Sequence, residues 1–242
     1  MLTIQTILQD FPGTSLLGNT ANTEITQIVS LDENNQDANF LSWCSDKNID
    51  KLNHITKGII ITSEKIHNIS VNKNCNYIVA KNPRLLFSQV IKKYFTPQEP
   101  TGISLSAKIA SDVKIGENVF VGENVVIESG CVIGNFSSIG HNTILHKNTH
   151  VGNQVKIGCN NTIGGVGFGY EKNEAGENEL IPHIGNVVIH DYVEIGNNTC
   201  IDRAVLGSTI LEKNVKVDNL VHIAHGVIIG ENSLIIANSM IG

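Results

Sequence analysis

The sequence predicts a mainly β protein in which a small α/β domain precedes a solenoid of short parallel strands. Helix-like and strand-like patterns mix over the first hundred residues, a proline-containing linker follows, and a six-residue hydrophobic period then runs to the end of the sequence. A fixed short period is the sequence signature of a solenoid, because each repeat builds one part of a coil. We therefore expect an α/β domain over residues 1–100 and a β-solenoid domain over residues 101–242.

The composition limits the classes of partner and compartment. The 242 residues carry a formal net charge of -6, which disfavours nucleic acid as a main partner. The five cysteines are odd in number and contain no C-x-x-C pair, as expected for free structural thiols in a reducing cytoplasm. The N-terminus lacks the basic and apolar regions of a signal peptide, and the uncharged run 219–230 is too short to span a membrane. We expect a cytoplasmic protein with no transmembrane segment.

The first domain combines helical and strand signals. One helical face gathers the apolar residues of the first segment, at Ile4, Ile7 and Leu8. Runs rich in β-branched residues predict strands at residues 25–31, 58–62 and 77–80. Asn82 and Pro83 form an N-cap and a first-turn proline, so an apolar stripe predicts a helix over residues 83–95. Residues 96–102, with two prolines, form the linker.

The solenoid is predicted by aliphatic residues that return every six positions. The first series is unbroken and comprises Ile103, Ile109, Ile115, Val121, Ile127, Ile133, Ile139, Leu145, Val151, Ile157 and Ile163. The phase resumes at Ile189, Ile195 and Ile201, and again at Leu211, Val217, Ile223, Ile229, Ile235 and Ile241. One aliphatic residue per hexad would point inward, and the small residue after it would let the chain turn a corner. Such a stack depends on neighbouring coils and on caps. Since the last period is incomplete at Gly242, we expect a domain truncated at its C-terminus.

The first interruption of the repeat, residues 164–188, is where we expect chemistry, because loops on a rigid scaffold carry function. Four glycines surround Phe168 and Tyr170 in its first part. This pattern suits a loop that presents aromatic faces to a ligand. A flexible surface insertion is the alternative interpretation.

The second interruption adds four residues between Ile201 and Leu211. Asp202 and Arg203 lie in it, and they either pair with each other at a bulge or leave Arg203 to bind a phosphate or carboxylate.

A histidine in the resumed repeat is the candidate general base. His225 follows the inward Ile223 by two residues, and Asp218 and Asn219 precede it by about one hexad. We expect their corner to lie close enough to orient the imidazole, which would then accept a proton from a substrate. The competing interpretation is an ordinary surface or core histidine.

Three other histidines, His141, His146 and His150, lie close together in the sequence. A zinc site needs three protein ligands and an open position. The pair His141 and His146 is similar to one in the β-helical carbonic anhydrases of the γ class, which carry a third histidine about two coils upstream, where this sequence has Leu105. We therefore expect no metal site.

Several segments together resemble one enzyme family, and they cover most of residues 80–242. They are residues 81–83, 166–170, 181–185, 201–203 and 218–225. The hexapeptide array is similar to the left-handed β-helix acyltransferases, and the order of parts resembles the UDP-3-O-acylglucosamine N-acyltransferases of lipid A biosynthesis. The resemblance implies a left-handed parallel β-helix, a homotrimer and no cofactor. It also implies transfer of a 3-hydroxyacyl group from acyl carrier protein to the 2-amine of a UDP-linked amino sugar.

The same resemblance assigns roles to individual residues. It implies that His225 is catalytic and that the acceptor is bound by Phe168, Tyr170, His183, Asp218 and Asn219. A looser match implies that Phe40 and Trp43 bind uridine in the first domain.

Two departures from the family keep other functions open: Gly226 stands where the family usually has Asn, and residues 40–47 depart from its uridine motif. One alternative is an N-acyltransferase that acts on another nucleotide-linked amino sugar and uses acyl-CoA. The other is a non-catalytic trimeric scaffold that binds sugar nucleotides, and it stays open because the resemblance places the backbone N–H for the oxyanion just beyond Gly242.

Overall fold

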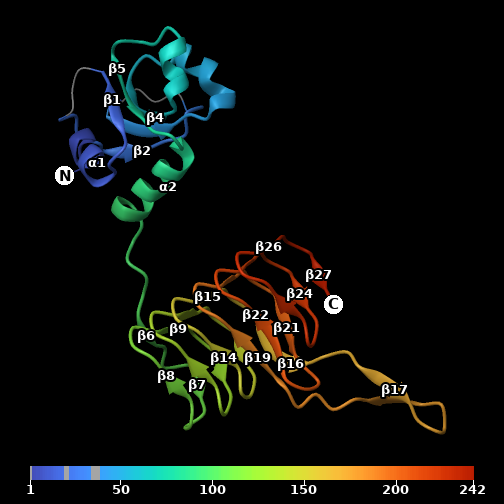
Figure 1. The fold of residues 1–242 in the computed structure, drawn as a ribbon. Helices are drawn as coiled ribbons and strands as arrows, with labels where there is room; N and C mark the ends of the chain where they lie inside the picture. The colour runs from blue at the N-terminus through green and yellow to red at the C-terminus, as the bar shows by residue number, and fades with distance from the viewer. Residues whose placement is uncertain (1, 19–21, 34–38) are drawn as a thin grey trace. The chain divides into compact units, whose positions relative to one another are not determined.

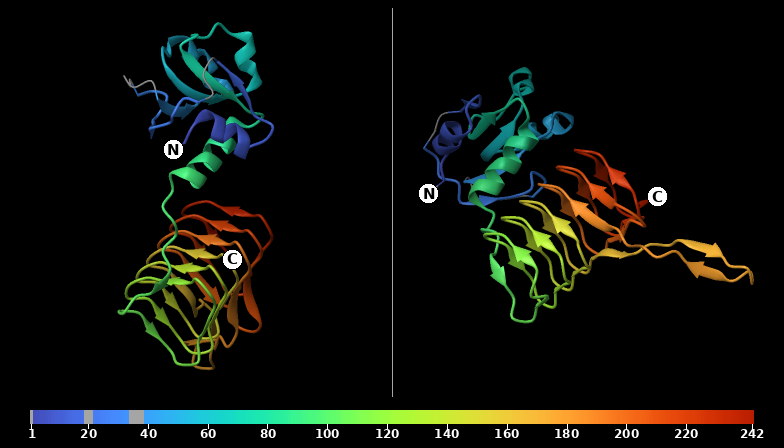
Figure 2. Two further views of the ribbon diagram at one scale, coloured as in Figure 1. Left: turned by 90° about the vertical axis from the view of Figure 1, so that its left-hand side faces the viewer. Right: turned by 60° about the horizontal axis from the view of Figure 1, so that its bottom comes forward.

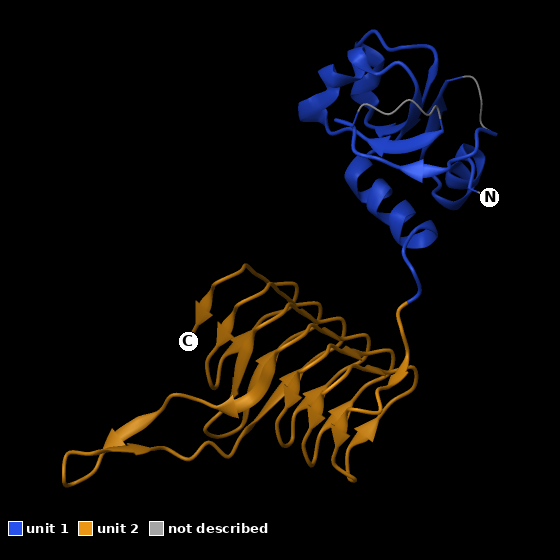
Figure 3. Ribbon diagram, turned by 180° about the vertical axis from the view of Figure 1, so that it is seen from behind, with its two compact units in different colours: residues 1–98 blue, residues 99–242 orange. Residues whose placement is uncertain are grey.

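The computed structural model describes residues 2–18, 22–33 and 39–242, and it divides into two compact units (Figure 3). Unit 1 comprises residues 1–98 and unit 2 residues 99–242. Unit 1 is a small mixed α/β domain, and unit 2 is a β-helix. The predicted fold class is therefore confirmed.

Unit 1 is built on a five-stranded sheet in the order β1-β5-β4-β3-β2, in which only β1 is antiparallel to its neighbour. The strands are β1 (Ser15–Leu17), β2 (Gln27–Ile28), β3 (Phe40–Trp43), β4 (Gly58–Thr62) and β5 (Cys75–Val79). The helices are α1 (Ile4–Asp10) and α2 (Pro83–Tyr94), with two 3₁₀ helices, η1 (Asp46–His54) and η2 (Glu64–Asn68). Both predicted helices are present, whereas the strand expected over residues 25–31 is reduced to β2.

The central strand of unit 1 is covered on both faces, so its side chains alternate between two apolar clusters. Ile59 and Ile61 pack with residues of α1 and α2, whereas Ile60 packs with residues of η1 and η2. All five residues of β4 are buried, which explains its unbroken apolar run. The α2 helix begins as predicted, because the Leu85 N–H donates to Asn82 Oδ1 over 3.1 Å.

Unit 2 is a left-handed β-helix whose coils stack into three parallel sheets, here called the first, second and third faces (Figure 1). The first face contains β6 (Gly102–Ile103), β9 (Phe120–Val121), β12 (Ser138–Ile139), β15 (Lys156–Ile157), β20 (Glu194–Ile195), β23 (Lys216–Val217) and β26 (Leu234–Ile235). The second contains β7 (Lys108–Ile109), β10 (Val126–Ile127), β13 (Ile144–Leu145), β16 (Thr162–Val166), β21 (Cys200–Arg203), β24 (His222–Ile223) and β27 (Met240–Ile241). The third contains β8 (Lys114–Ile115), β11 (Val132–Ile133), β14 (His150–Val151), β19 (Asn186–Ile189), β22 (Ser208–Leu211) and β25 (Ile228–Ile229).

The register of the sheets converts the six-residue period into coils. Val126 pairs with Ile144, so one coil takes 144 − 126 = 18 residues, or three hexads. His150 pairs with Val188 across the first interruption, an offset of 188 − 150 = 38. Cys200 pairs with His222 across the second, an offset of 222 − 200 = 22. Both interruptions are therefore absorbed at coil corners, and the predicted inward aliphatic residues form one continuous core beyond the first coil.

The corners of the coils adopt left-handed backbone, which suits asparagine and strains most other residues. In the described ranges, nine of these corner positions hold Asn, namely Asn118, Asn124, Asn142, Asn148, Asn160, Asn198, Asn214, Asn232 and Asn238. Phe136 has a φ of 58° at the same kind of position, and its side chain is 57% exposed. Its large side chain therefore gains little from packing while its backbone is strained.

Replacing Phe136 with asparagine is expected to raise the free energy of unfolding by about 1 kcal/mol, because Asn tolerates a positive φ. Denaturant unfolding followed by circular dichroism would measure the change. Leu206→Asn is the matched control, since Leu206 is exposed but has no positive φ. Equal changes in the two variants would contradict the strain at position 136.

All five cysteines are free, and Cys44, Cys75 and Cys131 are buried. Burial raises the pKa of the Cys44 thiol to about 11. These three side chains therefore act as small apolar residues of the two units. Within the described part of the chain, no helix has the length and apolar character needed to cross a membrane.

Candidate active site

The first interruption forms an insertion at the corner between the second and third faces of unit 2. The chain leaves the coil after β16, forms an antiparallel hairpin of β17 (Tyr170–Lys172) and β18 (Asn178–Leu180), and returns through β19. In Figures 1 and 2 this hairpin projects away from the stacked coils of unit 2. The base of the insertion therefore lies against the coil while its tip extends into solvent.

Two histidines lie together at the foot of the insertion, where it meets the coil. His183 lies on the returning segment, and His225 lies at the corner that follows β24. Their ring centroids are 4.8 Å apart and the rings are nearly perpendicular, at 88°. His183 is only 6% exposed, whereas His225 is partly exposed. Two of the sequence-predicted site residues thus share one site, although they are far apart in the sequence.

The backbone of Gly167 lies so close to these two histidines that a side chain has no room there. A Cβ at this position would lie 2.8 Å from His225 Cδ2 and 2.9 Å from His183 Nε2, closer than real Cβ atoms approach other atoms. The glycine-rich start of the insertion is therefore explained in part by close approach of backbone to the two rings.

The second interruption anchors the insertion. Arg203 Nε donates to the Gly164 carbonyl over 2.7 Å, where the chain leaves the coil. Asp202 instead contacts His222, whose Nε2 lies 3.0 Å from the carboxylate. Asp202 and Arg203 therefore do not pair with each other, as one interpretation of the sequence expected, because each has a partner on another segment.

The two predicted aromatic residues lie farther out on the insertion. Phe168 is 85% exposed, and its ring lies 5.1 Å from that of Tyr170, which is also exposed. The pair presents an aromatic surface close in sequence to Gly167, as the glycine-rich pattern suggests.

Asp218 and Asn219 do not join His225 within one chain. They lie at the corner between the first and second faces, whereas His225 lies at the next corner of the same coil. A six-residue step covers one side of the coil, so the expectation that they orient His225 in the same chain is wrong. Their contacts are local: Asn219 Nδ2 donates to Asp218 Oδ1, and Asn197 N–H donates to Asn219 Oδ1.

Gly226, the departure next to His225, has a φ of 75°. A Cβ at this position would meet no other atom of the described residues within 4 Å, so space does not limit the side chain there. Glycine and asparagine both tolerate this left-handed conformation. The backbone geometry therefore explains why either residue suits the position after His225.

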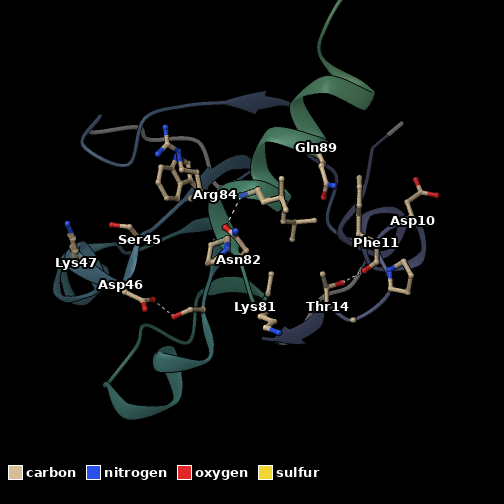
Figure 4. Close-up of a pocket in the computed structure, with 18 residues that line it drawn as sticks. Asp10, Phe11, Thr14, Ser45, Asp46, Lys47, Lys81, Asn82, Arg84 and Gln89 are labelled. Carbon is tan, nitrogen blue, oxygen red and sulfur yellow. Dashed lines mark hydrogen bonds between the residues drawn. The ribbon is translucent and has the colours of Figure 1, made fainter. Parts of the chain in front are cut away.

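A second candidate site lies in unit 1, in a cleft of about 1040 Å³ (Figure 4). Three segments line it: the loop after α1, the loop after β3 and the start of α2. Trp43 lines this cleft, and its ring packs 6.3 Å from Phe87. Phe40 does not line it, because its side chain is buried in the core against Gly58. Of the two predicted uridine-binding residues, only Trp43 has a surface available to a ligand.

The charges around this cleft are unequally paired. Asp46 contacts Lys65 over 2.8 Å, and hydrogen bonds from Lys65 and then Ser63 hold the pKa of its carboxyl below the usual value. Asp10, also on the cleft, pairs with Lys93. The cations that line the cleft, Lys47, Lys81 and Arg84, have no ion-pair partner among the described residues. The cleft therefore combines an indole ring with unpaired positive charge. The sequence indicated Trp43 as a uridine-binding residue and residues 81–83 as a family-like helix start, but it assigned no binding role to these cations.

The stacked coils define a hexapeptide-repeat protein, and the family described as "Bacterial transferase hexapeptide (six repeats)" matches residues 208–242. The chain is 42% identical over 228 residues to the UDP-3-O-acylglucosamine N-acyltransferase of Campylobacter lari, covering 89% of this chain and 70% of that protein. The chain therefore belongs to the UDP-3-O-acylglucosamine N-acyltransferase family.

Shorter and more distant similarities were also found. The protein of the same name from Christiangramia forsetii is 54% identical over 77 residues, which cover 32% of this chain and 23% of that protein. Among solved structures, the UDP-N-acetylglucosamine acyltransferase of Francisella novicida has a TM-score of 0.48 and 23% identity, covering 54% of this chain and 46% of that chain.

Proposed function

We propose that the protein transfers a 3-hydroxyacyl group from acyl carrier protein to the 2-amine of UDP-3-O-acylglucosamine, a cytoplasmic step of lipid A biosynthesis. His225 is the general base. The observation that supports this most directly is the position of His225 at the foot of the insertion, against His183, in a member of this family. The partly exposed ring is accessible to a substrate while one side is held by protein.

The chemistry requires a base at this point. The amine nitrogen attacks the thioester carbonyl, the carbon–sulfur bond breaks, and an amide and a thiol form. His225 takes a proton from the attacking nitrogen and returns it to the departing thiolate, so the imidazole ends neutral. Base assistance of this kind contributes about 10²- to 10⁴-fold in rate. Phe168 and Tyr170 would supply aromatic surface for the acceptor beside this base.

Asp218 and Asn219 are proposed to act across a subunit boundary. They lie at a different corner from His225, so they can serve the same site only if another protomer brings its corner to it. This requirement fits a homotrimer, in which each site is completed by a neighbour. Light scattering would give the mass of the assembly.

The uridine diphosphate part of the acceptor is proposed to bind in the cleft of unit 1. Trp43 offers a ring on which uracil can stack, and Lys81 and Arg84 offer positive charge for the diphosphate. Arg84 is the stronger candidate of the two cations, because a guanidinium can bind phosphate oxygens through two hydrogen bonds.

Arg84→Ala is therefore expected to weaken UDP binding by about 10-fold or more, since hydrogen bonds to charged groups contribute about 1.5–3 kcal/mol. Isothermal titration calorimetry with UDP would measure the affinity. Lys92→Ala is the control, because it removes the same charge from the exposed end of α2 outside the cleft. Equal affinity in the two variants would argue against this nucleotide site.

The acyl donor decides between the proposed function and its alternatives. We expect turnover of UDP-3-O-acylglucosamine with 3-hydroxyacyl thioesters of acyl carrier protein and little with the matching acyl-CoA. Preference for acyl-CoA and a different amino sugar would favour the second N-acyltransferase. Binding of UDP-sugars without any turnover would favour a scaffold.

A further inference from the structure

We propose that His183 is a positioning residue for the acyl-transfer step: a buried neutral imidazole whose free Nε2 stabilises the protonated form of His225. This inference rests on the proposed function, because it requires that His225 accepts a proton during the reaction. The family resemblance suggested that His183 binds the substrate. Here His183 instead supports the general base, His225.

The hydrogen bonding of His183 defines its tautomer. Its Nδ1 lies 2.7 Å from the carbonyl oxygen of Ile181. A carbonyl oxygen only accepts hydrogen bonds, so Nδ1 must carry the proton. In the neutral ring, Nε2 is then left with a lone pair that can accept a hydrogen bond. The turn at residues 181–183 thus presents an acceptor toward the interior of the site.

This acceptor is unsatisfied. His183 Nε2 is buried without a hydrogen bond to any described residue, in a side chain that is more than nine-tenths buried. An unsatisfied buried polar atom costs about 1–3 kcal/mol, so its presence calls for a functional explanation. Direct contact with substrate is a poor explanation, because Gly167 and His225 cover the atom.

His225 is the neighbouring ring that can donate to this atom, and protonation makes it a stronger donor. An imidazolium carries an N–H on both ring nitrogens, and its ring centre lies only 4.8 Å from that of His183. The nearby Asp202 carboxylate contacts His222 through Oδ2, and Arg203, which has no acceptor atom, donates to the Gly164 carbonyl. His183 Nε2 is a buried acceptor without a partner among the described residues, and its ring lies against that of His225.

This role does not change which groups gain and lose protons in the reaction. His225 receives the proton from the amine nitrogen and passes it to the thiolate. His183 keeps its own proton on Nδ1 throughout and only accepts a hydrogen bond from the imidazolium. An imidazolium is a stronger hydrogen-bond donor than a neutral imidazole, so the interaction strengthens as His225 becomes charged and should lower the barrier more than it tightens substrate binding.

Three substitutions separate this role from simple packing. His183→Phe keeps a ring but removes the acceptor, His183→Leu removes both, and His183→Gln places an amide oxygen near the position of Nε2. We expect kcat to fall about 10- to 100-fold in the Phe and Leu variants with little change in KM. The Gln variant should recover most of that loss. His190→Phe, at an exposed histidine outside the site, is the control.

The measurements distinguish failure of the inference about His183 from failure of the proposed function. Full activity of His183→Phe, or an equal loss in the Phe, Leu and Gln variants, would overturn the inference. Nitrogen-15 NMR of His183 gives a test independent of turnover: we expect the Nδ1–H tautomer, and the Nε2–H tautomer would overturn the inference. If His225→Ala retained normal turnover, the proposed function would fail first, whatever the result at His183.

Discussion

Replacing His225 with alanine should lower kcat/KM by about 10²- to 10⁴-fold, the contribution of a positioned general base. The amine must lose a proton as its nitrogen bonds to the thioester carbon, and the two neighbouring histidines, His183 and His222, are held by other groups. His183 has its Nε2 covered, and His222 contacts Asp202. Formation of the amide product from the acyl carrier protein thioester would measure the loss.

Two controls make this result specific to the base. His190→Ala removes an exposed histidine from a turn outside the site and should keep normal turnover. UDP affinity should be the same in His225→Ala and the unaltered protein, since the proposed nucleotide cleft belongs to unit 1. Turnover by His225→Ala at the normal rate would refute the assignment of the base.

The side chains that lie next to His225 could be predicted only in part from the sequence. The insertion was recognisable as a departure from a regular repeat and His225 as a candidate base inside the resumed repeat, and the structure brings His183 and His225 to within ring contact. Asp218 and Asn219 were expected beside His225 because they are near in sequence. In a coil of 18 residues, spatial neighbours are one whole coil apart, so a six-residue separation places residues at different corners.

The same distinction explains what could be predicted of the fold. The hexads and the helix at residues 83–94 carry periodic signals that depend on burial alone, and both are present. By contrast, β1 and β3 are three and four residues long, and η1 and η2 have a single buried residue each, Leu52 and Ile66. Such short segments are stabilised by tertiary packing, which leaves no repeated pattern to detect.

The small residue after each inward aliphatic was expected to let the chain turn, and the structure adds a second reason for glycine there. At the corner between the first and second faces, Gly140, Gly158 and Gly196 stack on one another. A Cβ on Gly140 would lie 2.5 Å from the carbonyl carbon of Gly158. The obstacle is backbone, and the Gly140 N–H bond to the Ile157 carbonyl, 2.8 Å long, keeps the two coils together.

Gly140→Ala is therefore expected to lower the free energy of unfolding of unit 2 by about 3 kcal/mol, at the upper end of the usual cost of overpacking. Neither coil can move away without breaking ladder hydrogen bonds on two faces. Denaturant unfolding followed by circular dichroism would measure the loss, with the melting of unit 1 as an internal reference.

Gly165→Ala is the matched control, because its Cβ would meet Thr162 Cγ2 at 3.6 Å and Asp202 Oδ1 at 3.8 Å, which are ordinary contacts. Neither Gly140 nor Gly165 has a positive φ, so the comparison isolates the approach of the coils from backbone strain. We expect the control to change stability by no more than about 0.5 kcal/mol. If both variants were equally stable, glycine at position 140 would serve chain flexibility at the corner rather than the close stacking of coils.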